Sequence, residues 1–467
     1  MYRSFLRSRP PRLTIGPVKM NFLWKSVSTT VTSNGPVKPV DDIRNVRELD
    51  RLLELVRDRS DPALRSTMPT RSPQLWTESL RSGSSRTQVE APEKRETSSE
   101  LPARPMHYSY SEFVLPFSSD PAVLEQYTNA RGGIRTGKLM EDLDALAGGV
   151  AYKHLMERGV TQIKGSINDR GFYVVTAAVE RLDMLHPLTP SNVKDIRLSG
   201  QVIYTGRSSM EVVVKMEALG RDNAEETIML GRFTMVCLDA FTHKARPVNG
   251  LIPMTEDEKK LYAMGEALKE RRQTRGQQSL DKKPPTSEEA ALLHHLYLKY
   301  GNGTKNSDGL QPVPISETLL ENTMQMYPQQ RNIQSKVFGG YLMRLAYELG
   351  YSNAAIFTRG VLRFMSLDEI TFKHPVPIGS VLRLRSRIVH TVSNAPSSVH
   401  VVVSASVIDD QTGDERVTNE FKFTWGSPDR SFSRTVIPRT YEEAMQWVDA
   451  TRALKVGTEI RGMLAGS

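Results

Sequence analysis

Apolar residues recur at helical spacing in the stretch from Gln330 to Ala354. After Gly339 and Gly340 they return every three or four residues, as in a helix that buries one face. These residues are Leu342, Leu345, Ala346 and Leu349. We therefore predict a long helix that begins near Gly340. Because glycine has no Cβ, a ligand can approach the backbone there, and the free N–H groups of a helix start suit an oxyanion or a phosphate.

Residues 129–154 repeat this pattern. Aligning Gly137 with Gly340 also aligns Asn129 with Asn332. Two related helices about 200 residues apart, each followed by strand-like sequence, imply a duplicated domain.

Each helix is followed by four segments that are rich in Val, Ile, Thr and Tyr. They are 172–185, 194–205, 208–219 and 227–240 in the first repeat, and 361–374, 381–392, 399–409 and 416–426 in the second. Alternation of apolar and polar residues predicts antiparallel sheets with one covered face. The pairs Leu182-Asp183 and Leu367-Asp368 fall in the first segment of each set, and we interpret them as equivalent. We expect an α+β protein in which each sheet wraps around its own helix.

The predicted elements divide the chain into six segments. They are a leader (1–40), a helix and linker (41–105), a first sheet-and-helix domain (106–243), a helical connector (244–323), a second domain (324–430), and a helix and tail (431–467). The linker helix spans Asp41 to Arg59, and a short final helix is predicted from Tyr441 to Ala450. In the connector, Thr255 and Glu258 have the spacing of a capping box at a helix start.

The positive charge of the chain is concentrated at its N-terminus. Residues 1–40 contain seven Lys or Arg and no Asp or Glu, so the formal charge of +9 leaves +2 for the other 427 residues. A basic, acid-free segment with interspersed apolar residues is typical of a mitochondrial transit peptide, although a basic tail without a targeting role is the alternative. The nearly neutral remainder argues against a nucleic-acid partner.

Several kinds of site are excluded or disfavoured. Cys237 is the only cysteine, so an intramolecular disulfide and a metal site of paired cysteines are impossible. No apolar run approaches the roughly 18 residues of a membrane-spanning helix, so we expect no integral membrane segment. His294 and His295 lie on different faces of a predicted helix and lack a third ligand at suitable spacing. We therefore expect no metal site.

The segment from Asn332 through Phe338-Gly339-Gly340 to Met343, together with Asp144, resembles the hotdog acyl-coenzyme A thioesterases. The duplicated layout, the basic N-terminus and the sequences RLAYEL and EDLDALAG are similar to the mitochondrial acyl-coenzyme A thioesterase 9 family, over about residues 106–449. The resemblance implies two tandem hotdog domains, each an antiparallel sheet around a long central helix. It also implies hydrolysis of fatty acyl-CoA to free fatty acid and coenzyme A.

The same resemblance implies a location and an assembly. The protein would be mitochondrial, in the matrix or on the inner-membrane side, and would form a trimer of two-hotdog chains. An apolar outer sheet face would supply the contact surface of that oligomer. The partner is the acyl-CoA substrate, which brings its own coenzyme A, and no separate cofactor is expected.

Thioester hydrolysis needs an activated water and hydrogen-bond donors for the developing oxyanion. The resemblance assigns Asp144 as the general base, and an inward-facing carboxylate is costly unless it is paired or functional. Asn332 would hold the water or the thioester through its amide. The backbone N–H of Gly340 would polarise the carbonyl oxygen. Without the resemblance, Asp144 is equally compatible with a surface or capping residue, and Asn332 with a turn residue.

Five further residues are predicted to contact the substrate. Phe338 and Gly339 precede the helix start. Arg331, Lys336 and Arg344 are close enough in sequence to neutralise the phosphates of coenzyme A, although each is also compatible with a solvated charge.

The second, mirrored site departs from the family pattern. Tyr347 occupies the place of Asp144, and Glu348, one residue later, points about 100° away around the helix. Asn129 and Gly137 persist, but the Phe-Gly-Gly sequence is missing. We predict one working site and one degenerate site, and we interpret Glu348 as a salt-bridge residue.

Two other functions remain open at this stage. A hotdog enoyl-thioester hydratase would be expected to use a histidine, and none stands at the helix positions. A non-catalytic acyl-CoA-binding hotdog protein is the other alternative, and the presence of both Asp144 and Asn332 argues against it.

Overall fold

The computed structural model describes residues 40–70, 101–160, 170–186, 194–220, 225–300 and 309–465. They belong to one compact unit, Pro39–Ser467. The predicted transit peptide lies outside these residues apart from Val40, as do residues 71–100 of the predicted linker. Within the described parts, no helix has the length and apolar character needed to cross a membrane.

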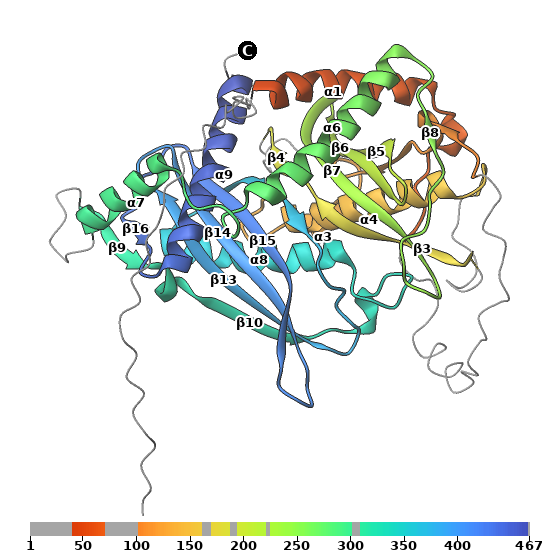
Figure 1. Cartoon of the computed structure of the whole chain (residues 1–467). Coiled ribbons are helices and arrows are strands. Elements are labelled where there is room, and N and C mark those ends of the chain that lie inside the picture. The colour runs from red at the N-terminus through yellow and green to blue at the C-terminus, as the bar shows by residue number, and fades with distance from the viewer. Residues whose placement is uncertain are drawn as a thin grey trace, which may run out of the picture. The chain divides into compact units, whose positions relative to one another are not determined.

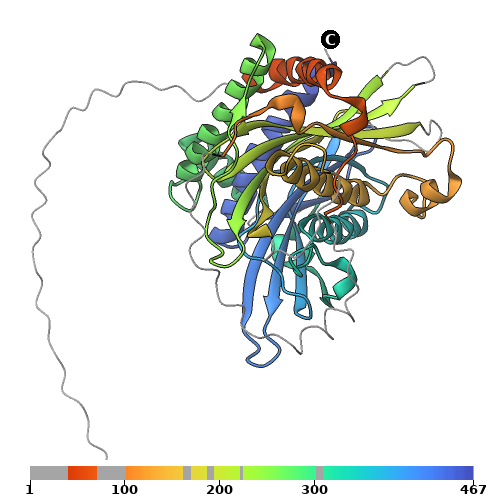
Figure 2. The ribbon, with the colours of Figure 1, turned by 90° about the vertical axis from the view of Figure 1, so that its right-hand side faces the viewer.

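Two helices of 20 residues each, α4 (Thr136–Leu155) and α8 (Gly339–Thr358), are the central elements of the two repeats (Figure 1). Both predicted helices are confirmed. In α8, Leu342 and Ala346 of the predicted apolar stripe are buried, as is the neighbouring Met343. Leu345 and Leu349 of the same stripe are only partly buried. Figure 2 shows α4 and α8 lying next to one another, and they touch at Gly137 and Gly340.

Within the described segments, twelve strands form one antiparallel sheet, which confirms the α+β class. The N-terminal half (residues 101–300) contributes β2 (Ser111–Leu115), β3 (Phe172–Val179), β4 (Leu182–Met184), β5 (Asp195–Thr205), β6 (Ser209–Leu219) and β7 (Glu225–Asp239). The C-terminal half (residues 309–465) contributes β10 (Leu320–Gln325), β11 (Arg363–Leu367), β12 (Ile370–Thr371), β13 (Val381–Val392), β14 (Ser397–Ile408) and β15 (Glu415–Ser427). The order is β10-β13-β14-β15-β11-β4-β7-β6-β5-β2, with β3 between β7 and β12. The two half-sheets therefore continue into one another.

The junction between the halves has twofold character. Strand β4 pairs with β11, with Leu182 opposite Leu367, and β3 pairs with β12, with Val179 opposite Ile370. A twofold rotation that exchanges the two halves brings residue 182 to the position of residue 370, and residue 179 to the position of residue 367. Strand β3 is therefore the equivalent of β11, and β4 is the equivalent of β12. The two Leu-Asp pairs are thus neighbours across the junction and not equivalent positions. The predicted match between them is wrong, because each predicted strand breaks into two short strands there.

The duplication extends beyond the two predicted domains. Two short parallel pairs, β1 (Arg104–Pro105) with β8 (Leu251–Ile252) and β9 (Gln311–Pro314) with β16 (Arg434–Ile437), occupy corresponding places in the chain. A helix with a capping box follows each pair: α6 (Glu256–Gln278), capped by Thr255, and α9 (Tyr441–Ala465), capped by Thr440. The connector therefore contains the closing helix of the first repeat. The final helix has 25 residues, so the prediction of a short helix is wrong.

The N-terminal half carries an additional layer. Helix α1 (Val40–Arg59) buries Leu49, Leu52 and Val56, which confirms that the predicted helix docks on the body. Residues 60–70, which we call the strap, then cross the outer face of α4. The strap passes so close to Gly149 that a Cβ there would lie 2.7 Å from the backbone oxygen of Met68. Glycine at this position is therefore a steric requirement of the strap.

The outer sheet face of the C-terminal half is polar. On β13, Arg383 and Arg385 form ion pairs with Glu321 of β10 and Glu415 of β15. In the N-terminal half, β5 is buried from Ile196 to Thr205. The expectation of an uncovered apolar sheet face is therefore wrong, because ion pairs or covering helices occupy these surfaces. Among the described residues, the other α-helices are α3 (Pro121–Tyr127) and α7 (Ser287–Tyr300).

Candidate active site

Asp144 lies on α4 at its contact with the start of α8. Its side chain is buried, with 1% of its surface exposed. One carboxylate oxygen accepts the backbone N–H of Gly340 at 2.6 Å, and the other accepts the hydroxyl of Thr176 at 2.8 Å. The carboxylate therefore joins three elements, α4 and β3 of the N-terminal half and α8 of the C-terminal half. Both of its oxygens are held in fixed positions.

Gly340 allows the two helices to meet at this point. A Cβ on Gly340 would lie 2.9 Å from the backbone of Glu141 and 3.0 Å from the Cβ of Asp144, so no larger residue fits. A Cβ on Gly339 would lie 3.3 Å from both Asp144 and the ring of Phe372. Asp144 and Gly340, which the resemblance assigns to one site, are therefore in contact. Gly339, predicted to contact the substrate, lies beside them. The N–H of Gly340, predicted as the oxyanion donor, donates to Asp144.

Burial raises the pKa of Asp144 to about 6. Hydrogen bonds from Thr176 and from the Gly340 N–H act in the opposite direction because they stabilise the ionised form, and the nearby Glu141 adds a smaller upward shift. A carboxyl group with this pKa is ionised at neutral pH but is a stronger base than an exposed aspartate. These are the properties of a general base.

Asn332 lies at the turn that leads into α8. Its side-chain oxygen accepts the backbone N–H groups of Gln334 at 2.9 Å and Lys336 at 3.1 Å. The side-chain oxygen of Asn332 therefore stabilises the turn, as the alternative interpretation of this residue expects. Its Nδ2 amide remains as a hydrogen-bond donor. Gln334 donates to the backbone oxygen of Val174 at 2.6 Å, two residues from Thr176 on β3. The Asn332 turn is thus fixed against the strand that holds Asp144.

Sequence reasoning missed Thr176 and Gln334. Thr176 stands in a run of β-forming residues, where threonine is common for reasons of propensity, so it carries no distinguishing signal. Gln334 lies within the predicted motif, but its partner is 160 residues away in the chain. A contact at that separation cannot be inferred from local sequence.

The predicted phosphate-binding residues have different environments. Arg331 is buried and donates to the backbone oxygen of Pro328 at 2.9 Å. Arg344 pairs with the buried Glu141 at 2.8 Å, across the contact between α4 and α8. Lys336 is exposed beside the Asn332 turn. Of the three, only Lys336 presents an exposed side chain. Phe338 is buried at the N-cap of α8.

The position that mirrors Asp144 is filled by aromatic rings. The ring of Tyr347 lies 5.4 Å from Phe364, 5.7 Å from Phe423 and 5.4 Å from Trp425, measured between centroids. The twofold relation between the halves makes Phe364 the equivalent of Thr176. In the mirrored site, aromatic residues therefore replace both Asp144 and its hydroxyl partner Thr176. Burial raises the pKa of Tyr347 to about 12, so the ring stays neutral. No carboxylate occupies this position.

The scaffold of the mirrored site is retained. The Asn129 side-chain oxygen accepts the N–H groups of Arg131 at 2.9 Å and Gly133 at 3.0 Å, the same offsets as at Asn332. Gly137 meets Tyr347 as Gly340 meets Asp144. Glu348 forms an ion pair with Arg135 at 2.6 Å, which agrees with the predicted salt-bridge role.

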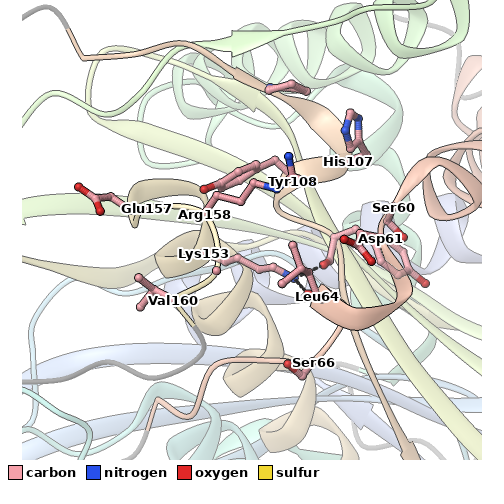
Figure 3. A pocket seen from close by; sticks show the side chains of 13 residues that line it. Ser60, Asp61, Leu64, Ser66, His107, Tyr108, Lys153, Glu157, Arg158 and Val160 are labelled. Carbon is pink, nitrogen blue, oxygen red and sulfur yellow. Dashed lines mark hydrogen bonds between the residues drawn. The ribbon is translucent and has the colours of Figure 1, made fainter.

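Two other features lie outside this site. Asp50, Glu54 and Glu217 are close enough to share a metal ion, but the amine of Lys215 contacts all three and already supplies a positive charge. A cavity of about 230 Å³ lies beside the strap, with Tyr108 and Lys153 in its lining (Figure 3). Lys153 is nine residues from Asp144, about two and a half helical turns, and therefore lies on the opposite face of α4.

Comparison with known proteins gives several matches, although no protein-family model matches the chain. The chain is 33% identical to Mus musculus acyl-coenzyme A thioesterase 10, mitochondrial, over 361 residues, 76% of this chain and 79% of that protein. It is 34% identical to Homo sapiens acyl-coenzyme A thioesterase 9, mitochondrial (75% and 78%), and 32% identical to Humulus lupulus acyl-coenzyme A thioesterase 2, chloroplastic (76% and 82%). A solved acyl-CoA hydrolase from Bacillus cereus matches with a TM-score of 0.31 and 20% identity, over 33% of this chain and 95% of that chain.

The two halves of one antiparallel sheet each pack on one long helix, and a buried carboxylate lies where the helices meet. This arrangement defines a double-hotdog protein of the thioesterase type. The identities above extend over about three quarters of the chain. The chain belongs to the acyl-coenzyme A thioesterase family, and the sequence resemblance is confirmed.

Proposed function

We propose that this protein hydrolyses fatty acyl-CoA thioesters to free fatty acid and coenzyme A, with Asp144 as the general base. The observation that carries the assignment is the position of Asp144, buried between the two halves, with a raised pKa and a hydrogen bond to the N-terminus of α8. Membership of the thioesterase family supports the same conclusion.

The shared N–H of Gly340 suggests how the base is activated. This N–H donates to Asp144 and thereby lowers the pKa of the carboxyl group. When the thioester carbonyl oxygen takes the N–H in its place, the oxyanion gains a donor at a helix N-terminus. Asp144 loses a stabilising hydrogen bond and becomes more basic at the same moment. Thr176 continues to hold the other carboxylate oxygen in position.

The remaining roles follow from the same geometry. Water attacks the carbonyl carbon while Asp144 takes its proton, and the thiolate of coenzyme A leaves. The Nδ2 amide of Asn332 orients the water or the thioester from the turn beside β3. Lys336 is exposed and available to the phosphates of coenzyme A. No metal or separate cofactor takes part in this scheme.

Location and assembly are also proposals. Two relatives are named as mitochondrial and one as chloroplastic, which supports import into an organelle, and the acid-free basic segment 1–40 favours mitochondria. We assign the protein to the matrix or to the inner-membrane side. Self-association, as a trimer of two-hotdog chains, is the expected assembly.

Thiol release from acyl-CoA of several chain lengths tests the proposed function. The rate of the purified protein should rise with pH through about 6 and level off above pH 7, since only ionised Asp144 accepts a proton. The variant Asp144→Asn should lose both the rate and this pH dependence, whereas Tyr347→Phe should retain both. A folded protein that releases no thiol from any chain length would exclude hydrolysis and favour the non-catalytic binder.

A further inference from the structure

Asn419 of β15 carries a buried amide without a hydrogen-bond partner. Its side chain has no exposed surface, and neither its Oδ1 nor its Nδ2 bonds to a group in the part of the chain that the structure describes. Burial of a donor and an acceptor that stay unpaired lowers the stability of a fold. The amide of Asn419 is therefore a candidate for contact with a ligand.

Asn419 lies on the inner face of the sheet, toward the N-terminus of α8. Residues at two-residue steps along β15 point to the same face. Trp425 meets α8 at Gly350, where a Cβ would lie 2.9 Å from its ring, and the ring centroid of Phe423 lies 5.7 Å from that of Tyr347. The contacts thus move toward the start of α8 as β15 is followed back from Trp425. Two further steps back along this face lead to Asn419.

The ring of Phe372 connects this part of β15 to the active site. Its centroid lies 6.4 Å from the ring centroid of Phe421, which is two residues from Asn419 on the same face. A Cβ on Gly339 would lie 3.3 Å from the Phe372 ring and 3.3 Å from the carboxylate of Asp144. The Phe372 ring therefore lies between Asp144 and the inner face on which Asn419 stands.

The other repeat has a methionine at the position of Asn419. In β15 and in β7, the pairing with the preceding strand shifts by one residue, directly before Asn419 in the first and directly before Met229 in the second. The same offset of 190 residues (419 − 229) relates Phe423 to Phe233, which pair with equivalent strands at the junction. Met229 is therefore the equivalent of Asn419, and it is equally buried.

Polar residues at this site are confined to the half that contains the acid. On the side of Asp144 they are the acid itself, Thr176 and Asn419, and the mirrored residues are Tyr347, Phe364 and Met229. The shift in strand pairing is present in both repeats, so it does not require an asparagine. The amide of Asn419 thus accompanies the catalytic acid and not the fold.

We infer that Asn419 determines which acyl chains are preferred, by forming hydrogen bonds with a hydroxyl group on the acyl chain of the substrate. The protein would then prefer hydroxyacyl-CoA to unsubstituted acyl-CoA of the same length. This inference rests on the proposed hydrolysis of acyl-CoA and names a substrate class for it. Phe372 and Phe421 supply apolar walls for the chain, and Asn419 supplies a polar group beside them.

A hydroxyl group complements both free atoms of the amide. Its oxygen accepts from Nδ2 of Asn419 while its O–H donates to Oδ1. A keto oxygen would leave Oδ1 unpaired, and a carboxylate would bring a second negative charge close to Asp144 between aromatic rings. An unsubstituted chain would leave both atoms unpaired, which is the condition under which a polar site discriminates against an apolar substrate.

Thiol release from matched pairs of thioesters tests the inference on the full chain. Each pair consists of an acyl-CoA and the acyl-CoA of equal length with a single hydroxyl group, placed at successive carbon atoms from one pair to the next. At one position or more, kcat/KM of the parent protein should favour the hydroxylated member by about tenfold or more. Release from the unsubstituted thioesters without a preference at any position would refute this inference alone. No release from any thioester would refute the proposed function and this inference with it.

Two substitutions locate the preference. Asn419→Leu has a similar shape without the amide, so it should abolish the preference and keep kcat/KM for unsubstituted thioesters within about twofold or raise it. Its midpoint of thermal unfolding should also rise, because no unpaired polar atoms remain. Met229→Leu, at the equivalent position, should keep the preference of the parent. A preference that persists in Asn419→Leu, or an equal loss of rate for both members of every pair, would overturn the inference. The ratio in the parent protein needs no variant and decides the question if Asn419→Leu does not fold.

Discussion

The two sites created by the duplication share a scaffold and differ in their chemistry. Asn129 and Asn332 stabilise the same turn, and Gly137 and Gly340 allow the same helix contact. Asp144 in one site is matched by Tyr347 in the other. The duplication has therefore kept the parts that fold the loop and pack the helices, and it has kept the acid in one copy only. Residues that persist in both copies, such as the turn asparagine, include structural ones, so their presence alone does not identify a working site.

The comparison also shows that burial of an ionised acid lowers the stability of the folded state. The aromatic cluster around Tyr347 gains apolar burial and favourable ring contacts. Asp144 is buried and ionised at neutral pH, and its raised pKa means that the folded state opposes its charge. The Tyr347 position thus has an aromatic core in place of a catalytic acid, whereas the Asp144 position retains a carboxylate whose burial is unfavourable. Matched substitutions in the two copies can test this interpretation.

Removal of the acid should have the largest effect. Asp144→Asn keeps the shape of the side chain but cannot accept a proton, so thiol release should fall by about 10²- to 10⁴-fold. Tyr347→Phe, at the mirrored position, should change the rate less than about twofold, because a neutral ring takes no part in the reaction. Equal losses in the two variants, measured on folded proteins, would show that the sites are not distinct.

The same substitution should stabilise the fold. The shift of the Asp144 pKa from 3.8 to about 6 corresponds to about 3 kcal/mol, as an upper bound, of destabilisation of the ionised native state. Because the folded pKa is above the unfolded one, this penalty is absent below about pH 4 and complete above about pH 6. In urea unfolding, Asp144→Asn should therefore exceed the parent in stability at pH 7.5 and equal it near pH 4. A variant less stable than the parent at pH 7.5 would contradict the assigned shift.

The two glycines at the helix contact should respond differently to a methyl group. In Gly340→Ala, the new Cβ meets backbone atoms of α4 at 2.9 Å, so the helices must separate and Asp144 loses its alignment. A displacement of about 1 Å near the reacting groups costs up to about 10²-fold in rate. In Gly137→Ala, the nearest atoms belong to the side chains of Tyr347 and Arg344, at 3.1 and 3.3 Å, which can adjust. Steady-state thiol release should fall strongly in the first variant and little in the second.

The two turn asparagines provide a third matched pair. Asn332→Ala removes two hydrogen bonds of about 1 kcal/mol each from the turn beside Asp144, together with the free amide donor, and should reduce the rate by about tenfold or more. Asn129→Ala removes the same two bonds from the degenerate side and should leave the rate nearly unchanged. Thiol release together with thermal unfolding of both variants separates the catalytic part from the structural part. Similar rate losses would assign both asparagines to the scaffold alone.

Local patterns predicted most of the fold. The helical spacing of apolar residues predicted α4 and α8, and the alternation of apolar and polar residues predicted the strands, because each of these elements buries one face. The patterns failed where the outcome depends on pairing between distant segments. The similarity of Leu182-Asp183 and Leu367-Asp368 is coincidental, since the strands break at the junction and the two pairs lie opposite one another.

The site was predicted only in part for a similar reason. Asp144 and Gly340 could be singled out because the family resemblance assigns them, and an acid on a helix face expected to point inward and a double glycine agree with that assignment. Thr176 could not, because its role depends on which strand lies under α4. The sequence of the strap likewise contains no pattern that predicts its position. Only Gly148 and Gly149, two adjacent glycines of α4, indicate that another segment passes there.

The smallest effect is expected at Glu348, the acid nearest to the degenerate position. Its ion pair with Arg135 joins two side chains that are 42% and 37% exposed, and pairs of this kind contribute at most about 1 kcal/mol to stability. Glu348→Gln should therefore leave thiol release within about twofold of the parent, and high salt should remove most of any difference in stability. Arg135→Gln should have a similarly small effect, because both variants break this pair. Glu348→Gln also removes the longer contact of Glu348 with Arg344, at 4.0 Å. If Glu348→Gln abolishes turnover while Asp144→Asn retains it, the working site belongs to the other half of the chain.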